Sequence, residues 1–197
     1  ALPIYRIEKF FETEVYSSLS PIATEETNFP LVPNQTLNVG FRLEVDHDSH
    51  RPLLSDEMLF SERFVVLPIG KKLPRFVFVP SAHKLDLVLV EDIIQHYAHR
   101  FFHNQTILES FVFRVTRNAD MRIDDEVASD LLVSMEDFLD ERTTGDCVRL
   151  EVQNGVGNEG MQYLKTNLQL ADQDVYTCDG PLALSSLMQI AFANGFE

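Results

Sequence analysis

The sequence predicts an α+β fold in which an antiparallel or mixed sheet of about five strands packs against amphipathic helices. Short segments with alternating apolar residues are typical of strands that bury one face, and longer segments with apolar residues at helical spacing are typical of amphipathic helices. Because strands come first and then alternate with helices along the chain, an α+β architecture is expected. The expected strands are 36–45, 63–67, 75–79, 110–116 and 148–152, and the expected helices are 4–18, 88–102, 124–142, 160–168 and 182–192.

The first part of the chain combines one helix with a series of strands. Segment 4–18 is expected to be helical because its apolar residues recur at helical spacing, and the prolines after it mark a loop. Segment 36–45 alternates like a strand, and we expect it to pair with 63–67 across a charged, histidine-containing loop at 46–55. A third strand follows at 75–79. The apolar positions of the first helix are Ile7, Phe10, Phe11 and Val15.

Two further helices carry broad apolar stripes. Segments 88–102 and 124–142 both have the stripe that a helix uses to cover a core. Acidic residues near the start of the second, Asp124 and Asp125, favour a helix start there because the helix dipole is positive at that end. We expect six residues of these helices and of strands 110–116 and 148–152 to lie in the core: Phe101, Val115, Leu131, Leu132, Phe138 and Leu150.

The charge balance limits the partners that this chain can bind. Its 31 acidic and 16 basic residues give a net charge of −15. Nucleic acids and other dense polyanions are bound by proteins largely through lysine and arginine, so an acidic chain repels them on average. We therefore expect no nucleic-acid binding and only weak binding of any other polyanion.

The remaining composition indicates an ordinary globular domain. No apolar run approaches the ~20 residues of a membrane-spanning helix, and the start of the chain lacks the pattern of a signal peptide. Cys147 and Cys178 are the only cysteines, which suggests no disulfide framework. A cytoplasmic, reducing location is the expectation.

One glycine-containing segment has the spacing of a nucleotide-binding site. Residues 155–160 read Gly-Val-Gly-Asn-Glu-Gly and precede Asp179 by about twenty residues, as in a dinucleotide-binding fingerprint. The preceding strand carries Arg149 and Glu151, whereas the strand of such a site is almost entirely apolar, so we expect a plain loop.

The histidines give no metal site by their pattern. His96, His99 and His103 share a helical face opposite the apolar stripe, without a supporting carboxylate or cysteine, and are expected to face solvent. The acids and histidines between 46 and 50 lack the spacing of a calcium loop. No bound metal or cofactor is therefore expected in this chain.

Several phrases, in order, resemble the middle domain of the long bacterial polyphosphate kinases. They are FPLVPNQTLNV at 29–39, LPRFVFVP at 73–80, VEDII at 90–94 with Phe101 and Phe102, FRVTRNAD at 113–120 followed by VRLEV at 148–152, and the closing segments 164–170, 174–176 and 180–182. The resemblance implies an internal part of a longer enzyme, with an N-terminal helix and linker at 1–25 and the middle domain at 26–197.

The resemblance also implies what the whole enzyme does. Such enzymes reversibly transfer the terminal phosphate of ATP to polyphosphate and need Mg²⁺. Their phosphate-accepting histidine and most of their ATP and metal contacts lie in C-terminal domains, and the adenine-contacting region lies in an N-terminal domain. This chain is therefore expected to be inactive alone, to position the other domains and to supply a contact of a homodimer. The rival hypothesis is a stand-alone acidic α+β domain that binds other proteins.

Three arginines are the candidate functional residues. Arg114, Arg117 and Arg149 lie on the two strands of the FRVTRNAD and VRLEV phrases. They either form cross-strand ion pairs, such as Arg114 with Glu151 or Arg149 with Asp120, or border the channel along which polyphosphate moves in the assembled enzyme. Arginine suits the second role because its planar fork offers two hydrogen bonds to a phosphate.

Overall fold

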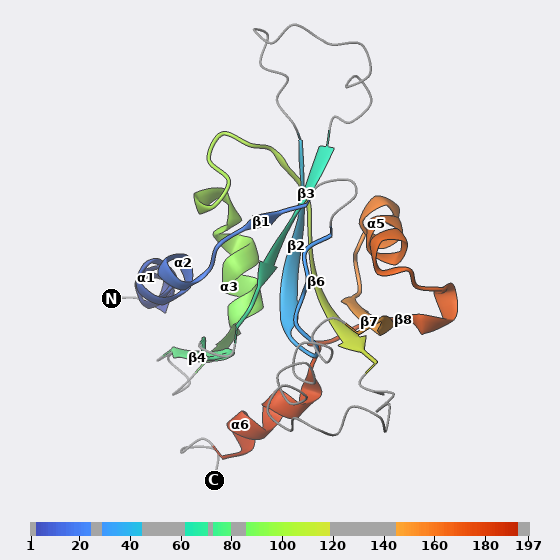
Figure 1. Ribbon diagram of the computed structural model, residues 1–197. Helices are drawn as coiled ribbons and strands as arrows, with labels where there is room; N and C mark the ends of the chain where they lie inside the picture. The colour runs from blue at the N-terminus through green and yellow to red at the C-terminus, as the bar shows by residue number, and fades with distance from the viewer. Residues whose placement is uncertain are drawn as a thin grey trace, which may run out of the picture.

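The computed structural model describes residues 3–24, 29–44, 62–70, 73–79, 86–118 and 145–192. Figure 1 views the main sheet nearly along its edge, with the N-terminal helices and α3 on one side and α5 on the other. The expected helix at 124–142, with its proposed core residues Leu131, Leu132 and Phe138, lies outside the described residues, as does the whole of the expected loop at 46–55.

The main sheet has six strands and is mixed. Neighbouring strands pair antiparallel, except that β7 and β8 pair in parallel. Their order across the sheet is β1 (Ile22–Ala23), β3 (Glu62–Pro68), β2 (Leu37–Glu44), β6 (Ile107–Arg117), β7 (Cys147–Gln153) and β8 (Val175–Cys178). The predicted α+β class and mixed sheet are confirmed, and so is the predicted pairing of the second and third of these strands.

The predicted third strand lies in a separate small sheet. Within the described residues, β4 (Phe76–Val79) pairs with β5 (Asp86–Leu89) alone, with Val77 opposite Val88. The prediction that a helix begins at residue 88 was wrong, because Val88 and Leu89 complete this pairing and the helix starts at Val90. The short strands β1 and β8 were not predicted from the sequence.

The helices follow the sequence pattern with local irregularities. α1 (Pro3–Phe10), a π-helical turn (Phe11–Val15) and α2 (Tyr16–Ser18) together form the helix that was predicted at 4–18. The predicted C-terminal helix is a 3₁₀ turn that continues into a single helical turn. The other helical segments are α3 (Val90–His96), η3 (Ala98–Arg100), α5 (Asn158–Leu168), η4 (Asp172–Asp174), η5 (Leu184–Leu187) and α6 (Met188–Ala191).

The core has two parts, one on each face of the sheet. On one face, alternate residues of β2 pack against the N-terminal helix and α3, which explains the apolar stripes of both helices. Within the described residues, the N-terminal helix therefore shares a core with the sheet, and the division at residue 25 stays a prediction. On this face the buried residues include Phe11, Val15, Val39, Phe41, Ile93, Ile94 and Phe102.

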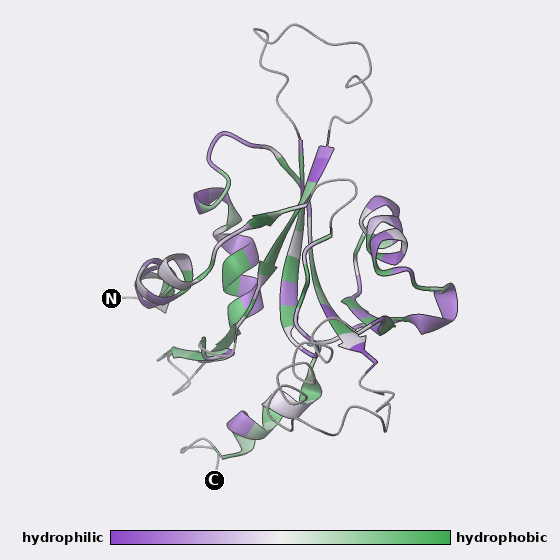
Figure 2. Cartoon of the chain, in the orientation of Figure 1, coloured by the Kyte–Doolittle hydropathy of each residue, from purple (hydrophilic) through white to green (hydrophobic). Residues whose placement is uncertain are grey.

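The second part of the core lies between β6, β7 and α5. Val115 lies opposite Leu150, and both are fully buried against α5, as predicted. Phe101, also predicted to be in the core, is only partly buried at the edge of the first part. Figure 2 shows the hydrophobic residues that run along the central strands. Gly40 lies directly against the ring of Phe111 on the neighbouring strand, so a side-chain carbon at position 40 would force that ring to move.

Candidate functional site

Arg114 lies in the middle of the sheet and is paired with Glu151. The antiparallel register of β6 and β7 places the two residues opposite each other, and the Arg114 Nη1 atom lies 2.8 Å from Glu151 Oε2. Both side chains are largely buried, with 18% and 15% of their surface exposed. Arg114 Nε also donates a hydrogen bond to the Gln35 carbonyl, at 3.3 Å. The predicted cross-strand ion pair is therefore present.

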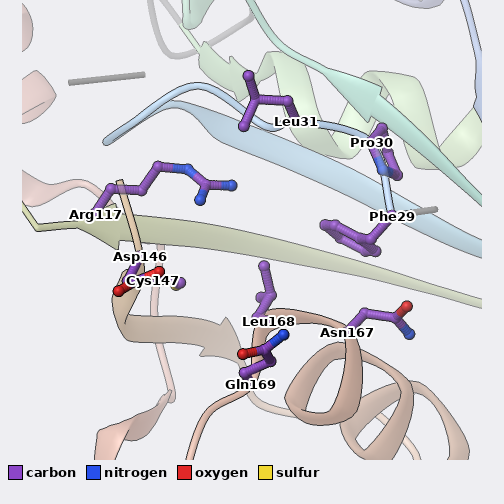
Figure 3. A pocket seen from close by; sticks show the side chains of 9 residues that line it. All are labelled: Phe29, Pro30, Leu31, Arg117, Asp146, Cys147, Asn167, Leu168 and Gln169. Atoms are coloured by element: carbon purple, nitrogen blue, oxygen red, sulfur yellow. The ribbon is translucent and has the colours of Figure 1, made fainter. Parts of the chain in front are cut away.

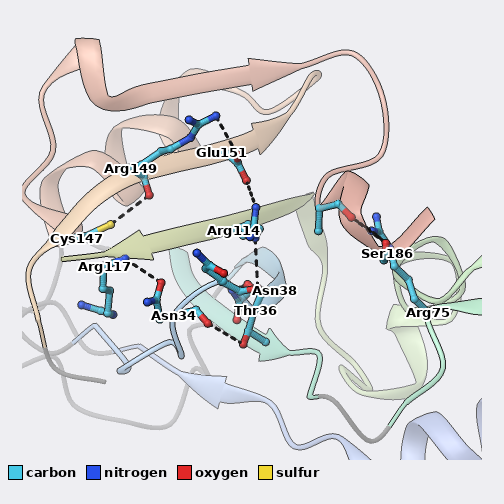
Figure 4. A network of polar contacts seen from close by, with 12 residues as sticks. Asn34, Thr36, Asn38, Arg75, Arg114, Arg117, Cys147, Arg149, Glu151 and Ser186 are labelled. Carbon is cyan, nitrogen blue, oxygen red and sulfur yellow. Dashed lines mark hydrogen bonds and ion pairs between the residues drawn. The ribbon is translucent and has the colours of Figure 1, made fainter. Parts of the chain in front are cut away.

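Arg149 contacts the same carboxylate from the neighbouring position on β7. Its Nη2 atom lies 3.0 Å from Glu151 Oε1, and its guanidinium carbon lies 4.0 Å from the centre of the Tyr176 ring on β8. Asp120, the other proposed partner, lies outside the described residues. Figure 4 shows Arg149 and Arg114 on either side of Glu151. Arg149 remains 44% exposed, so this arginine and the exposed ring of Tyr176 form a surface next to the Arg114–Glu151 pair.

Arg117 lies apart from the other two arginines. The pairing of β6 with β7 shifts register between Thr116 and Arg117, and such a bulge redirects the following side chain. The guanidinium donates hydrogen bonds to the carbonyls of Val32, at 3.1 Å, and Gly145, at 2.9 Å. The structure thus joins Arg114 and Arg149 through Glu151 and places Arg117 in a different environment.

Arg117 reaches into a cavity of about 420 Å³ between the start of β7 and the end of α5 (Figure 3). The cavity offers one guanidinium, one carboxylate and two amide side chains beside apolar walls. Burial raises the pKa of the Cys147 thiol, so this thiol is a poor nucleophile at neutral pH. The lining residues are Phe29, Pro30, Leu31, Arg117, Asp146, Cys147, Asn167, Leu168 and Gln169.

This cavity was not predicted from the sequence. Its walls come from segments that are far apart in the chain, and none of them carries a spacing that is typical of a site. One local signal exists at Gln169, which has a left-handed backbone with φ of 55° where α5 ends. Such a turn is a common helix end, and here the N–H groups of Gln169 and Leu170 bond the carbonyls of Thr166 and Lys165, so it does not identify a ligand.

A second polar group that was not predicted is the buried ion pair of Arg75 and Glu91. Their side chains are only 7% and 2% exposed, and the Arg75 Nη2 atom lies 2.7 Å from Glu91 Oε1. Arg75 Nη1 donates a hydrogen bond to the Ala183 carbonyl at 2.9 Å and another to the Ser186 hydroxyl. The pair therefore links α3 and the residue before β4 to the C-terminal segment, and Figure 4 shows Arg75 beside Ser186 of that segment.

Asp92 lies beside this pair at the start of α3. Burial, together with the neighbouring charge of Glu91, raises the pKa of the Asp92 carboxyl, and Arg75 opposes that shift.

The glycine-containing loop at 155–160 binds a carboxylate of this same chain. β7, α5 and the parallel strand β8 form the βαβ arrangement that a dinucleotide fingerprint requires. However, the Gly157 N–H donates a hydrogen bond to Glu109 Oε1. The same carboxylate forms an ion pair with Arg42, whose Nε atom lies 3.2 Å from Glu109 Oε2. An internal carboxylate thus lies where a phosphate would bind, which agrees with the prediction of a plain loop.

The remaining predicted features are consistent with a hydrated surface. His96, His99 and His103 are exposed, as expected. Among the residues that the structure describes, no three His, Cys, Asp or Glu side chains are grouped to hold a metal ion. None of the helices within the described ranges is long and apolar enough to cross a membrane.

The chain matches a known protein family over most of its length. The model of the polyphosphate kinase middle domain matches residues 5–190. The polyphosphate kinase of Staphylococcus epidermidis is 33% identical over 186 residues, which are 93% of this chain and 24% of that protein. The polyphosphate kinase of Bacillus anthracis is also 33% identical, over 93% of this chain and 26% of its own length.

A solved structure has the same fold. The crystal structure of polyphosphate kinase from Porphyromonas gingivalis superposes with a TM-score of 0.68 over 98% of this chain and 26% of that one, at 18% sequence identity. The chain thus spans about a quarter of the length of the relatives that it matches. Together, the family-model match and the relatives show that the chain belongs to the polyphosphate kinase middle-domain family.

Proposed function

We propose that this chain is the middle domain of an enzyme that reversibly transfers the terminal phosphate of ATP to polyphosphate, and that it acts there as a non-catalytic scaffold and dimer contact. The proposal is supported by the relatives named polyphosphate kinase, of which this chain covers about a quarter. The observation that carries the scaffold role is the use of arginines within the fold. Arg75 and Arg114 both bind buried or largely buried carboxylates and so hold distant segments together.

The chemical step is assigned to the rest of the full-length protein. ATP, Mg²⁺ and polyphosphate are proposed to bind there, in a homodimeric, cytoplasmic enzyme. The net charge of −15 supports this division, since the chain by itself repels polyanions. The rival hypothesis of a stand-alone interaction domain requires a protein no longer than this chain, which the length of its relatives disfavours.

The scaffold proposal is tested by assaying the 197-residue chain and the full-length protein side by side. Each is incubated with ATP, Mg²⁺ and a polyphosphate primer, and ADP formation is followed. We expect turnover only for the full-length protein. Turnover by the short chain that survives repurification would contradict the proposal, and calorimetric binding of polyphosphate to the short chain at submicromolar affinity would contradict the division of roles.

A second candidate function is that the arginines border the polyphosphate channel. The specific observation in its favour is that Arg114 and Arg149 share a single carboxylate, so this group of three side chains carries a net positive charge within an acidic chain. Arg149 is the best placed of the candidates, because it is 44% exposed and lies over an exposed tyrosine ring.

Arg→Lys variants of the full-length enzyme distinguish the two roles. Lysine keeps the charge but loses the fork that binds two phosphate oxygens. If the arginines serve a channel, Arg149→Lys lowers turnover several-fold at an unchanged melting temperature, and Arg114→Lys has a smaller effect. If the arginines only stabilise the sheet through their ion pairs, Arg114→Lys lowers stability and no variant changes turnover. Normal kinetics for all three variants, with Arg117→Lys included, would end the channel hypothesis.

A further inference from the structure

The C-terminal segment presents an apolar surface that nothing covers within the described residues. Four large apolar side chains of η5 and α6 and the residue after them are exposed, although the chain is strongly acidic elsewhere. They are Leu184 at 65%, Leu187 at 37%, Met188 at 57% and Phe192 at 79%. Figure 1 shows α6 extending away from the main sheet, and Figure 2 shows hydrophobic residues along this extension.

The sequence of this segment is unusual for a protein surface. No Asp, Glu, Lys or Arg occurs between Asp179 and Glu197, although such residues make up 24% of the chain. At an ordinary frequency, a stretch of this length carries about four of them. Clusters of exposed apolar residues without charges are typical of interaction surfaces rather than of solvated ends.

The base of the segment is anchored firmly. Leu182 is buried in the core, and Ala183 has a left-handed backbone with φ of 50°, where the chain turns outward. Arg75 binds the Ala183 carbonyl and the Ser186 hydroxyl while its charge is held by Glu91. A buried ion pair thus fixes the start of an exposed apolar segment, which orients the segment before any partner is bound.

We propose that Leu184, Leu187, Met188 and Phe192, here called the C-terminal apolar surface, dock against the part of the full-length protein that lies outside these 197 residues. The length of the relatives identifies the occupant, because about three-quarters of their length lies outside the matched region. The family model also ends at residue 190, within this surface. The docked partner is expected to be an apolar patch, since the surface offers no charge to pair with. This inference rests on the proposed role as a scaffold and specifies how that role is carried out.

Cysteine labelling of the full-length protein tests the proposal without measuring activity. Met188→Cys and Phe192→Cys are made separately, and Leu31→Cys is the matched control, because Leu31 is an apolar residue that is 53% exposed on another part of the chain. Modification by a maleimide is read for each peptide by mass spectrometry and compared with the rate in urea. We expect both cysteines to react at least about tenfold more slowly than the control, which corresponds to about 1.4 kcal/mol in favour of the covered state. Reaction as fast as that of Leu31→Cys would overturn the proposal.

Photo-cross-linking identifies what covers the surface. A benzophenone amino acid replaces Phe192 in the full-length protein, and cross-linked products are separated by mass before their peptides are sequenced. The expected product has the mass of one chain and joins position 192 to a peptide outside residues 1–197. A product of two chains, or one joined only to residues within 1–197, would assign the surface to another occupant and overturn the proposal. Because neither readout depends on turnover, the proposed function can fail or hold independently.

Discussion

Removal of the Glu91 carboxylate is the most direct test of how this fold is held together. Arg75 and Glu91 are 7% and 2% exposed, so neither charge is compensated by water. Among the described residues, Glu91→Ala leaves the guanidinium with only the Ala183 carbonyl and the Ser186 hydroxyl as acceptors. Breaking a buried ion pair from one side costs about 3–5 kcal/mol, mainly because the remaining charge stays desolvated. We expect a loss of that size.

The design includes a graded variant and an exposed control. Glu91→Gln removes the charge but keeps an oxygen that can accept a hydrogen bond, so its cost is expected to be smaller, about 1.5–3 kcal/mol. The control is Glu12→Ala, which breaks the ion pair with Arg100, where the two side chains are 42% and 43% exposed. Exposed pairs of this kind contribute less than about 1 kcal/mol.

Urea unfolding, followed by circular dichroism, measures all three variants. The slope of the free energy against urea concentration must match that of the parent chain, so that the change in midpoint reports stability. A cost below about 1 kcal/mol for Glu91→Ala, equal to that of the exposed control, would refute the reasoning. It would mean that the Arg75 charge reaches water once its partner is removed.

Three further variants test the packing and the cavity. Leu150→Ala, at a fully buried position on β7, is expected to cost about 2–5 kcal/mol in urea unfolding, and a cost below about 1 kcal/mol would mean that the core beneath α5 is loosely packed. Gly40→Ala places a methyl group against the Phe111 ring and is expected to cost about 1–3 kcal/mol, whereas an unchanged midpoint would show that the ring moves aside freely. For Cys147, burial raises the thiol pKa, so less thiolate is present at a given pH than in the unfolded chain. The pH midpoint for alkylation of Cys147 in a Cys178→Ser variant is expected to lie above the midpoint in urea, and a midpoint at or below that value would contradict this environment.

The features that depend on local pattern could be predicted from the sequence. The alternation in β6 and β7 fixed which residues face the core, because a shift of one residue would have buried Arg114 and Glu151 in place of Val115 and Leu150. The ion pair of Arg114 and Glu151 followed from the same register. The stripe of α3 and the apolar positions of the N-terminal helix were predictable for the same reason.

The features that depend on distant segments could not be predicted in this way. The run Asp86–Leu89 continues directly into α3, and a short apolar run before a helix does not show whether it belongs to a strand. Burial of Arg75 and Glu91 depends on the C-terminal segment, which lies about 100 residues away in sequence. The cavity next to Arg117 depends likewise on the placement of several separate segments.

The arginines of this domain differ in how far their surroundings leave them open to contact with another molecule. The guanidinium of Arg75 is enclosed and bonded by three groups from two other parts of the chain, α3 and the C-terminal segment, so its contacts hold the structure together. The guanidinium of Arg149 is held at one edge by Glu151 and from one face by Tyr176, and it stays substantially exposed. The exposed fraction of the side chain therefore distinguishes these two arginines. A polyanion that approaches this face of the sheet would meet Arg149 first, whereas Arg114 would have to leave Glu151 before it could bind a phosphate.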